Sequence, residues 1–124
     1  MLRVLVAEDN GSFRETILQV VSAIGAGTVV AAVGDGEAAE ESALRLQPDV
    51  AFLDVGLPGK NGLEVARRLR LVAPKLRVVL LLSDDRPSYR AAAAECGAAW
   101  IAKDRLAEEL GPFLGDLSSG SEAR

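Results

Sequence analysis

Short, nearly continuous apolar runs alternate along this chain with segments whose apolar residues recur at helical spacing. Strands without a polar face need cover on both sides, as in a parallel sheet whose crossover connections are helices. The pattern therefore predicts an α/β domain with a doubly wound, five-stranded parallel sheet and helices on both faces. The expected strands are Arg3–Ala7, Thr28–Val33, Val50–Leu53, Arg77–Leu82 and Ala98–Ala102.

The helices between these strands are predicted from periodicity and from residues that start or stop a helix. Ser12 and Glu15 fit a capping box at the start of the first helix, and Gly25 and Gly27 end it. The run Ala91–Ala94 favours a helix but offers little side-chain area to bury, so this helix should be the most weakly anchored. The later helices are expected over Glu37–Leu46, Leu63–Val72 and Ser88–Glu95, and from about Leu106 onward.

Size and charge narrow the class of protein. With 124 residues, 49% of them hydrophobic, the chain can form one domain, expected over residues 1–115, with a flexible tail or linker stub over residues 116–124. The net charge is -4 and the charges are interleaved, which argues against direct binding of nucleic acid. Glu8 follows the first apolar run too closely for a secretory signal, and no run is long enough to span a bilayer. We therefore expect a cytoplasmic protein with no membrane partner.

Polar residues stand at the carboxyl ends of four predicted strands, where open α/β sheets place their ligands. Glu8 and Asp9 follow the first strand, Asp54 the third, Ser83 the fourth and Lys103 the fifth. Because the chain contains no histidine, a Ser-His-Asp triad, a Cys-His pair and an imidazole-bound zinc are excluded. The chemistry of this edge must rest on oxygen and lysine.

These five residues predict a shared metal and phosphoryl site. Three converging carboxylates repel one another unless a cation joins them, and ligands that are all oxygen favour Mg²⁺. Lys103 can neutralise a phosphoryl oxygen, Ser83 can donate a hydrogen bond to another, and Asp54 can attack phosphorus in line. Taken singly, each residue is also explained as a helix cap, a turn residue or a surface charge. Their joint placement at four strand ends favours the shared site.

These residues resemble the receiver domain of bacterial two-component response regulators, and the likeness extends over the chain up to about Leu114. The matching motifs are Val4–Asn10, Asp54–Glu64, Ser83 after three leucines, and Trp100–Lys103. The resemblance implies a flavodoxin-like strand order of 2-1-3-4-5. It also implies a phosphoacceptor signalling domain rather than an enzyme that turns over an external substrate, with at most slow loss of its own phosphoryl group.

The resemblance further implies a role for each site residue. Asp54 would accept a phosphoryl group from the phosphohistidine of a sensor histidine kinase or a phosphotransfer protein. Mg²⁺ would be held by Asp9, Asp54 and the backbone carbonyl of Gly56, with Glu8 acting mainly through a metal-bound water. Ser83 would then move toward the phosphoryl oxygens.

In the family's switch, Trp100 would turn inward as Ser83 moves and would change the face formed by the fourth helix, fifth strand and fifth helix. An ordinary packing role is the simpler alternative for Trp100. An output domain or partner protein would read this face, and a homodimer through it is a further hypothesis.

Two departures from the family's usual pattern bear on phosphorylation and switching. Asp84 and Asp85 follow Ser83, where a small residue is usual, and the stretches 83–97 and 97–100 each look about one residue short. These departures keep open the alternative that the chain is a degenerate receiver, which is not phosphorylated and serves as a fixed interaction module. A flavodoxin-like ligand-binding protein is disfavoured because Glu8 and Asp9 place negative charge where a bound phosphate would sit. A phosphatase is disfavoured because no second acid stands close after Asp54.

Overall fold

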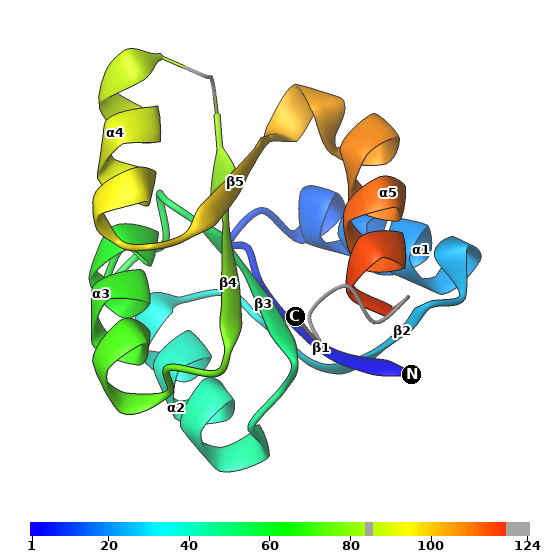
Figure 1. Cartoon of the computed structure of the whole chain (residues 1–124), viewed down its shortest axis with the longest axis horizontal. Coiled ribbons are helices and arrows are strands. Elements are labelled where there is room, and N and C mark those ends of the chain that lie inside the picture. Colours follow the sequence, from blue (N-terminus) through cyan, green and yellow to red (C-terminus); the bar gives the residue numbers. More distant parts are fainter. Residues whose placement is uncertain (84–85, 119–124) are drawn as a thin grey trace.

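A five-stranded parallel sheet with helices on both faces forms the body of the molecule (Figure 1). The computed structural model describes residues 1–83 and 86–118. The strand order is β2-β1-β3-β4-β5, which confirms the predicted doubly wound sheet. The strands are β1 (Leu2–Ala7), β2 (Gly27–Val33), β3 (Val50–Asp54), β4 (Arg77–Leu82) and β5 (Ala99–Ala102), and the helices are α1 (Gly11–Ile24), α2 (Gly36–Leu46), α3 (Gly62–Val72), α4 (Pro87–Glu95) and α5 (Leu106–Ser118).

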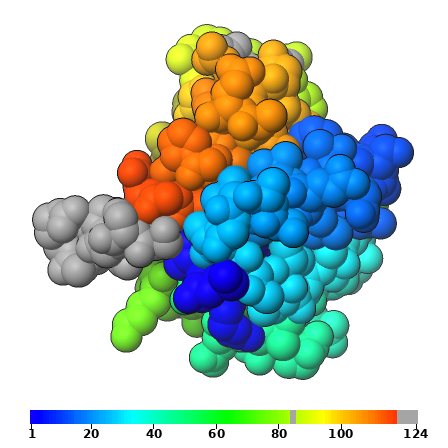
Figure 2. All heavy atoms as spheres, turned by 90° about the vertical axis from the view of Figure 1, so that its right-hand side faces the viewer, coloured from blue at the N-terminus to red at the C-terminus, as the bar shows by residue number. Residues whose placement is uncertain are grey.

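Successive residues of the central strands point to opposite faces of the sheet and fill two separate cores. In β3, Ala51 and Leu53 join the core beneath α2, α3 and α4, whereas Val50 and Phe52 join the core beneath α1 and α5. All five β3 residues are buried, and the first four, Val50–Leu53, form the continuous apolar run seen in the sequence. Figure 2 shows α1 and α5 packed side by side over the second of these cores.

The predicted strands agree with the structure to within one residue at each end. One of these differences bears on the site, because β3 includes Asp54 as its last residue instead of ending at Leu53. The Asp54 backbone is paired with Leu81 of β4. The carboxylate is therefore carried by a hydrogen-bonded strand in the middle of the sheet.

Side-chain caps begin the helices that flank the site. The predicted capping box of Ser12 and Glu15 is wrong, because α1 begins two residues earlier and is capped by Asn10, whose Oδ1 accepts the Phe13 N–H at 2.8 Å. Gly25 ends this helix with φ +76°, as predicted, because glycine adopts this left-handed backbone without strain. The start of α3 does carry a capping box, formed by Asn61 and Glu64.

The last two helices are packed to different extents. Ala93 is the one fully buried residue of α4, in agreement with the expectation that the alanine-rich helix is weakly anchored. The α5 helix, in contrast, continues to Ser118 and buries Leu117, so the ordered structure passes the predicted domain end at residue 115. None of the helices in the described ranges is long and apolar enough to cross a bilayer.

Candidate functional site

Three carboxylates meet where β1 and β3 end. Glu8 and Asp9 follow directly after β1, and Asp54 closes β3, the strand that pairs with β1. One carboxylate oxygen from each residue lies within 4.8 Å of the other two. Glu8 and Asp54 are buried, whereas Asp9 is exposed. The structure thus brings together the three acidic residues that the strand pattern placed at this edge.

The ammonium group of Lys103 lies between two of these carboxylates. Its Nζ is 3.0 Å from Glu8 Oε1 and 3.1 Å from Asp54 Oδ1. Lys103 follows β5 and opens a 3₁₀ turn over Lys103–Arg105 that leads into α5. On another side, the ammonium faces the ring of Phe13, 5.3 Å from the ring centroid. Residues from three strand ends and from α1 therefore surround one positive charge.

Burial and the crowded charges shift the pKa values of this group. Burial, with the Asp54 carboxylate as a further cause, raises the pKa of Glu8 above its ordinary value, although Lys103 and the Asn10 backbone act in the opposite direction. Burial by itself would lower the pKa of Lys103, but Glu8 and Asp54 outweigh that effect and hold the pKa above its ordinary value. Burial thus dominates the shift of the Glu8 pKa, whereas the two neighbouring carboxylates dominate the shift of the Lys103 pKa.

Backbone groups hold the acidic side chains in place. The Asn10 N–H donates to Glu8 Oε2 at 3.1 Å, and the Gly56 N–H donates to Asp54 Oδ1 at 3.3 Å. The Arg14 side chain donates through Nη1 to the backbone carbonyl of Glu8 at 2.7 Å. The two N–H groups therefore restrain the carboxylates of Glu8 and Asp54, and Arg14 restrains the backbone of Glu8.

The donor atoms of this cluster fit a hard divalent cation. Among the described residues, the buried Oε1 of Glu8 has no hydrogen-bond partner of good geometry, although the Lys103 ammonium lies nearby. A Cβ added to Gly56 would lie 3.8 Å from Asp54 Oδ2, so the backbone of residue 56 runs close to the same carboxylate. Three carboxylates and no nitrogen or sulfur donor match the preference of Mg²⁺ for oxygen. The acidic cluster can therefore hold a metal ion.

Ser83 and Trp100 lie in or directly after the strands that follow β3 in the sheet order. Ser83 follows β4, next to Asp54 on β3 and Lys103 after β5, and it is exposed. Trp100 lies in β5, opposite Leu80, and is half-buried against the core beneath α4. The roles expected for both residues remain predictions. The neighbouring acids at positions 84 and 85 lie outside the described residues.

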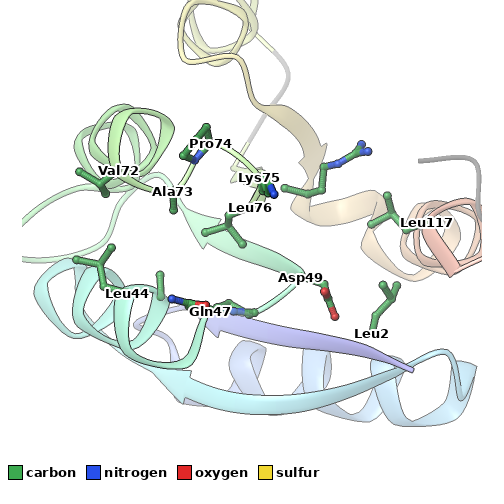
Figure 3. A pocket seen from close by; sticks show the side chains of 13 residues that line it. Leu2, Leu44, Gln47, Asp49, Val72, Ala73, Pro74, Lys75, Leu76 and Leu117 are labelled. Carbon is green, nitrogen blue, oxygen red and sulfur yellow. The ribbon is translucent and has the colours of Figure 1, made fainter. Parts of the chain in front are cut away.

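A separate pocket of about 730 Å³ lies at the opposite edge of the sheet (Figure 3). Leu2 and Arg77, which begin β1 and β4, line it together with Asp49, which precedes β3. Leu44 and Val72 form part of its apolar wall. Since this edge carries the amino ends of the strands, the pocket is remote from the acidic cluster and takes no part in the candidate site.

Comparison with known proteins identifies the family. The profile of the response regulator receiver domain matches residues 4–110 of the chain. The chain is a receiver domain. The probable transcriptional regulatory protein NarL of Mycobacterium tuberculosis is 34% identical to this receiver domain over 122 residues, covering 98% of the chain and 56% of NarL.

A protein-glutamate methylesterase/protein-glutamine glutaminase of Myxococcus xanthus is 36% identical over 121 residues. The match covers 97% of this chain and 33% of the methylesterase. The receiver domain therefore spans about half, or less, of the length of these curated relatives. The transcriptional and methylesterase activities in their names belong to those longer proteins.

Solved structures agree with this assignment. The signal receiver domain of Mycobacterium tuberculosis NarL superposes with a TM-score of 0.88 at 34% identity, covering 96% of this chain and 97% of that one. The response regulator domain of Thermotoga maritima CheB gives a TM-score of 0.86 at 25% identity, with the same coverage of both chains. These comparisons establish a receiver domain of two-component response regulators with a role in signalling.

The structure of the receiver adds two residues that the sequence analysis did not assign to the site. Phe13 faces Lys103, and Arg14 donates to the backbone of Glu8. From the sequence alone, Phe13 is only an apolar residue of the first helix. The contact of Phe13 with Lys103 joins residues from opposite ends of the chain, and helical spacing alone does not reveal it. The sequence signal for Phe13 and Arg14 is their position shortly after the acidic pair Glu8 and Asp9.

Proposed function

We propose that this receiver domain accepts a phosphoryl group on Asp54 from the phosphohistidine of a sensor histidine kinase or a phosphotransfer protein in the cytoplasm. The observation that carries the proposal is the buried Asp54 carboxylate, grouped with Glu8 and Asp9 within 4.8 Å and lying 3.1 Å from Lys103. A fixed carboxylate beside positive charge suits nucleophilic attack on phosphorus. The phosphorylated domain is a signal, so no external substrate is turned over.

The acidic cluster would hold Mg²⁺ during this reaction. Asp9, Asp54 and the backbone carbonyl of Gly56 would be the direct ligands, and Glu8 would act through a metal-bound water. Bound Mg²⁺ would neutralise the charge that develops on the phosphoryl oxygens. The buried Oε1 of Glu8 supports this assignment, because among the described residues it has no hydrogen-bond partner of good geometry and a metal-bound water could supply one.

The transfer itself needs little covalent chemistry from the protein. A carboxylate oxygen of Asp54 attacks phosphorus in line, and a new O–P bond forms as the P–N bond to the donor imidazole breaks. The imidazole leaves with the bonding electron pair. Lys103 would pair with one phosphoryl oxygen and Ser83 would donate a hydrogen bond to another. The other residues orient these groups and counter their charge.

The role of Lys103 can be separated from metal binding. Lys103→Ala should weaken the changes that depend on the phosphoryl group and leave the affinity for Mg²⁺ largely intact, since the ammonium is not a metal ligand. Calorimetric titration with Mg²⁺ and the rate of phosphorylation report the two properties independently. Equal loss of both would contradict the proposed division of roles.

The proposed output is a change in the face formed by α4, β5 and α5. Ser83 would move toward the phosphoryl group and Trp100 would turn inward behind it. The shallow anchoring of α4, with only Ala93 fully buried, supports a face that can change at small cost. A partner protein, or an output domain joined after α5, would read this change.

A homodimer through the same face is a related proposal. Sedimentation with Mg²⁺ and a phosphoryl mimic tests it, because an unchanged monomer would refute it.

A degenerate receiver that works as a fixed interaction module is the second candidate. The sequence observation that favours it is the pair Asp84 and Asp85, which places negative charge after Ser83. Repulsion of an incoming phosphoryl group would then prevent the reaction. Failure of purified sensor kinases to label the native chain would favour this candidate, and labelling by a kinase would exclude it.

Intact-mass spectrometry after incubation with a small acyl phosphate and Mg²⁺ tests the leading proposal. The native chain should gain one phosphoryl group, whereas Asp54→Asn should gain none. A chelator added before the acyl phosphate should prevent the adduct. An adduct of equal yield on the Asp54→Asn chain would refute Asp54 as the acceptor.

A further inference from the structure

Among the described residues, the Lys103 ammonium has a neighbour that carries no charge, the ring of Phe13. Glu8 Oε1 and Asp54 Oδ1 lie 3.0 and 3.1 Å away, and the centroid of the Phe13 ring lies at 5.3 Å. An ammonium within about 6 Å of a ring centroid is attracted by the negative face of the ring. The attraction is stronger when water is partly excluded, and only 23% of the Lys103 side chain is exposed. Phe13 is therefore a third partner of Lys103.

Phe13 is held firmly in its position. Its N–H donates at 2.8 Å to Oδ1 of Asn10, the residue that caps α1, so the backbone at residue 13 is fixed in the first turn of the helix. Its half-buried side chain packs against the core beneath α1 and α5. Helix capping and packing already fix the ring. It can therefore restrain the flexible lysine without a further loss of its own conformational entropy during the reaction.

The two carboxylate partners of Lys103 belong to the cluster that fits a divalent cation. With a divalent ion in that cluster, Glu8 and Asp54 would attract Lys103 less strongly, and the two positive charges would repel each other. The Phe13 ring is different, because hard cations select oxygen ligands and do not compete for an aromatic face. Phe13 is then the partner that can still hold Lys103 beside the acidic cluster.

We propose that Phe13 is a positioning residue that keeps the Lys103 ammonium directed toward the phosphoryl group when the acidic cluster holds its cation. The inference rests on the proposed phosphorylation of Asp54 and adds a residue to that site. Phe13 itself neither binds the metal nor touches the reacting atoms. Its removal should therefore slow phosphoryl transfer without weakening Mg²⁺ binding.

Phe13→Leu is the informative variant, because leucine keeps an apolar side chain and removes the aromatic face. We expect phosphorylation by a small acyl phosphate to slow by about threefold to tenfold, with unchanged Mg²⁺ affinity by calorimetry. Phe13→Tyr keeps the ring and should restore the native rate. Phe113→Leu is the matched control, since Phe113 packs against the same core and meets Phe52 edge-on, whereas the ring that faces Lys103 is that of Phe13. It should leave the rate unchanged.

A double-variant cycle and a spectroscopic signature complete the test. In a Lys103→Met background, Phe13→Leu should cause no further slowing. In the native chain with Mg²⁺, the ε-methylene protons of Lys103 should be shifted upfield in NMR spectra by the ring current of Phe13. Phe13→Leu should abolish this shift.

The outcomes separate this inference from the proposed function. An unchanged phosphorylation rate in Phe13→Leu overturns the positioning role. Equal slowing by Phe113→Leu overturns it too, as does further slowing by Phe13→Leu in the Lys103→Met background. An unshifted Lys103 signal in the Mg²⁺-bound native chain overturns it without any substitution. No adduct on the native chain, from either acyl phosphate or kinase, overturns the proposed function and this inference together.

Discussion

The Lys103→Met substitution measures how strongly one ammonium stabilises the metal-free acidic site. Lys103 Nζ lies 3.0 Å from Glu8 and 3.1 Å from Asp54, and the Glu8 side chain is fully buried. At an effective dielectric constant of about 20, each contact represents about 5 kcal/mol of gross attraction, before desolvation is subtracted. Removing one partner of a buried pair costs about 3–5 kcal/mol. Because Lys103 is 23% exposed, we expect about 3 kcal/mol.

This loss corresponds to a large change in melting temperature. For a chain of 124 residues, an unfolding entropy of about 2.1 cal/mol/K per residue amounts to about 0.26 kcal/mol/K. Lys103→Met should then lower the Tm by about 12 °C in thermal unfolding followed by circular dichroism at pH 7 with a chelator. Mg²⁺ should recover part of the loss, because a cation replaces the missing ammonium among the carboxylates.

Lys60→Met is the matched control for this measurement. The Lys60–Glu40 ion pair has the same length, 3.0 Å, but the Lys60 side chain is 44% exposed, and Arg68 stays 3.4 Å from Glu40 after the change. An exposed pair contributes about 0–1 kcal/mol, so the Tm should fall by less than about 4 °C. Equal losses for the two variants would refute the reasoning, because burial would then have no bearing on the strength of these pairs.

Three further predictions follow from the fold and from the acidic site. Gly62→Ala should cost about 2 kcal/mol in chemical denaturation, because the added Cβ would overlap the backbone carbonyl of Asp54; an unchanged midpoint would contradict this packing. Gln47→Gly should raise the Tm by about 2–4 °C, because Gln47 ends α2 at φ +49°, where glycine is unstrained; a lower Tm would show that the glutamine side chain contributes more. Folding raises the pKa of Glu8, so the native state binds more protons than the unfolded state between the ordinary and the raised pKa. The metal-free stability contributed by Glu8 should therefore fall as pH rises through that window, and Glu8→Gln should remove this component; parallel stability curves for the two proteins would contradict the sign.

The fold and the acidic cluster could be predicted because both follow from local pattern. Fully buried strands such as β3 are apolar on both faces, and this is visible as a continuous run in the sequence. The carboxyl ends of parallel strands share one edge, and the strand order implied by the family resemblance sets the first strand beside the third, so Glu8 and Asp54 were expected to lie near each other, as they do. In a sheet of this kind, residues that act at strand ends can therefore be predicted from the sequence.

The details that were missed depend on tertiary contacts or on competing local signals. Asn10 and Ser12 are both good helix caps, and the structure selects Asn10, directly after the acidic pair. The α5 helix passes Gly115 because Leu117 is buried against the core beneath α1 and α5, a contact that the polar sequence around it conceals. The contact between Phe13 and Lys103 joins distant parts of the chain, and the periodicity of the sequence does not predict it.

The central claim is that Asp54 is the residue that carries the phosphoryl group. Trapping the acyl phosphate with borohydride, which reduces a phosphorylated aspartate to homoserine, locates the acceptor by peptide mass mapping. The native chain treated with acyl phosphate and Mg²⁺ should show homoserine at position 54 and at no other acidic residue. Reduction at Glu8 or Asp9 in its place would contradict the account.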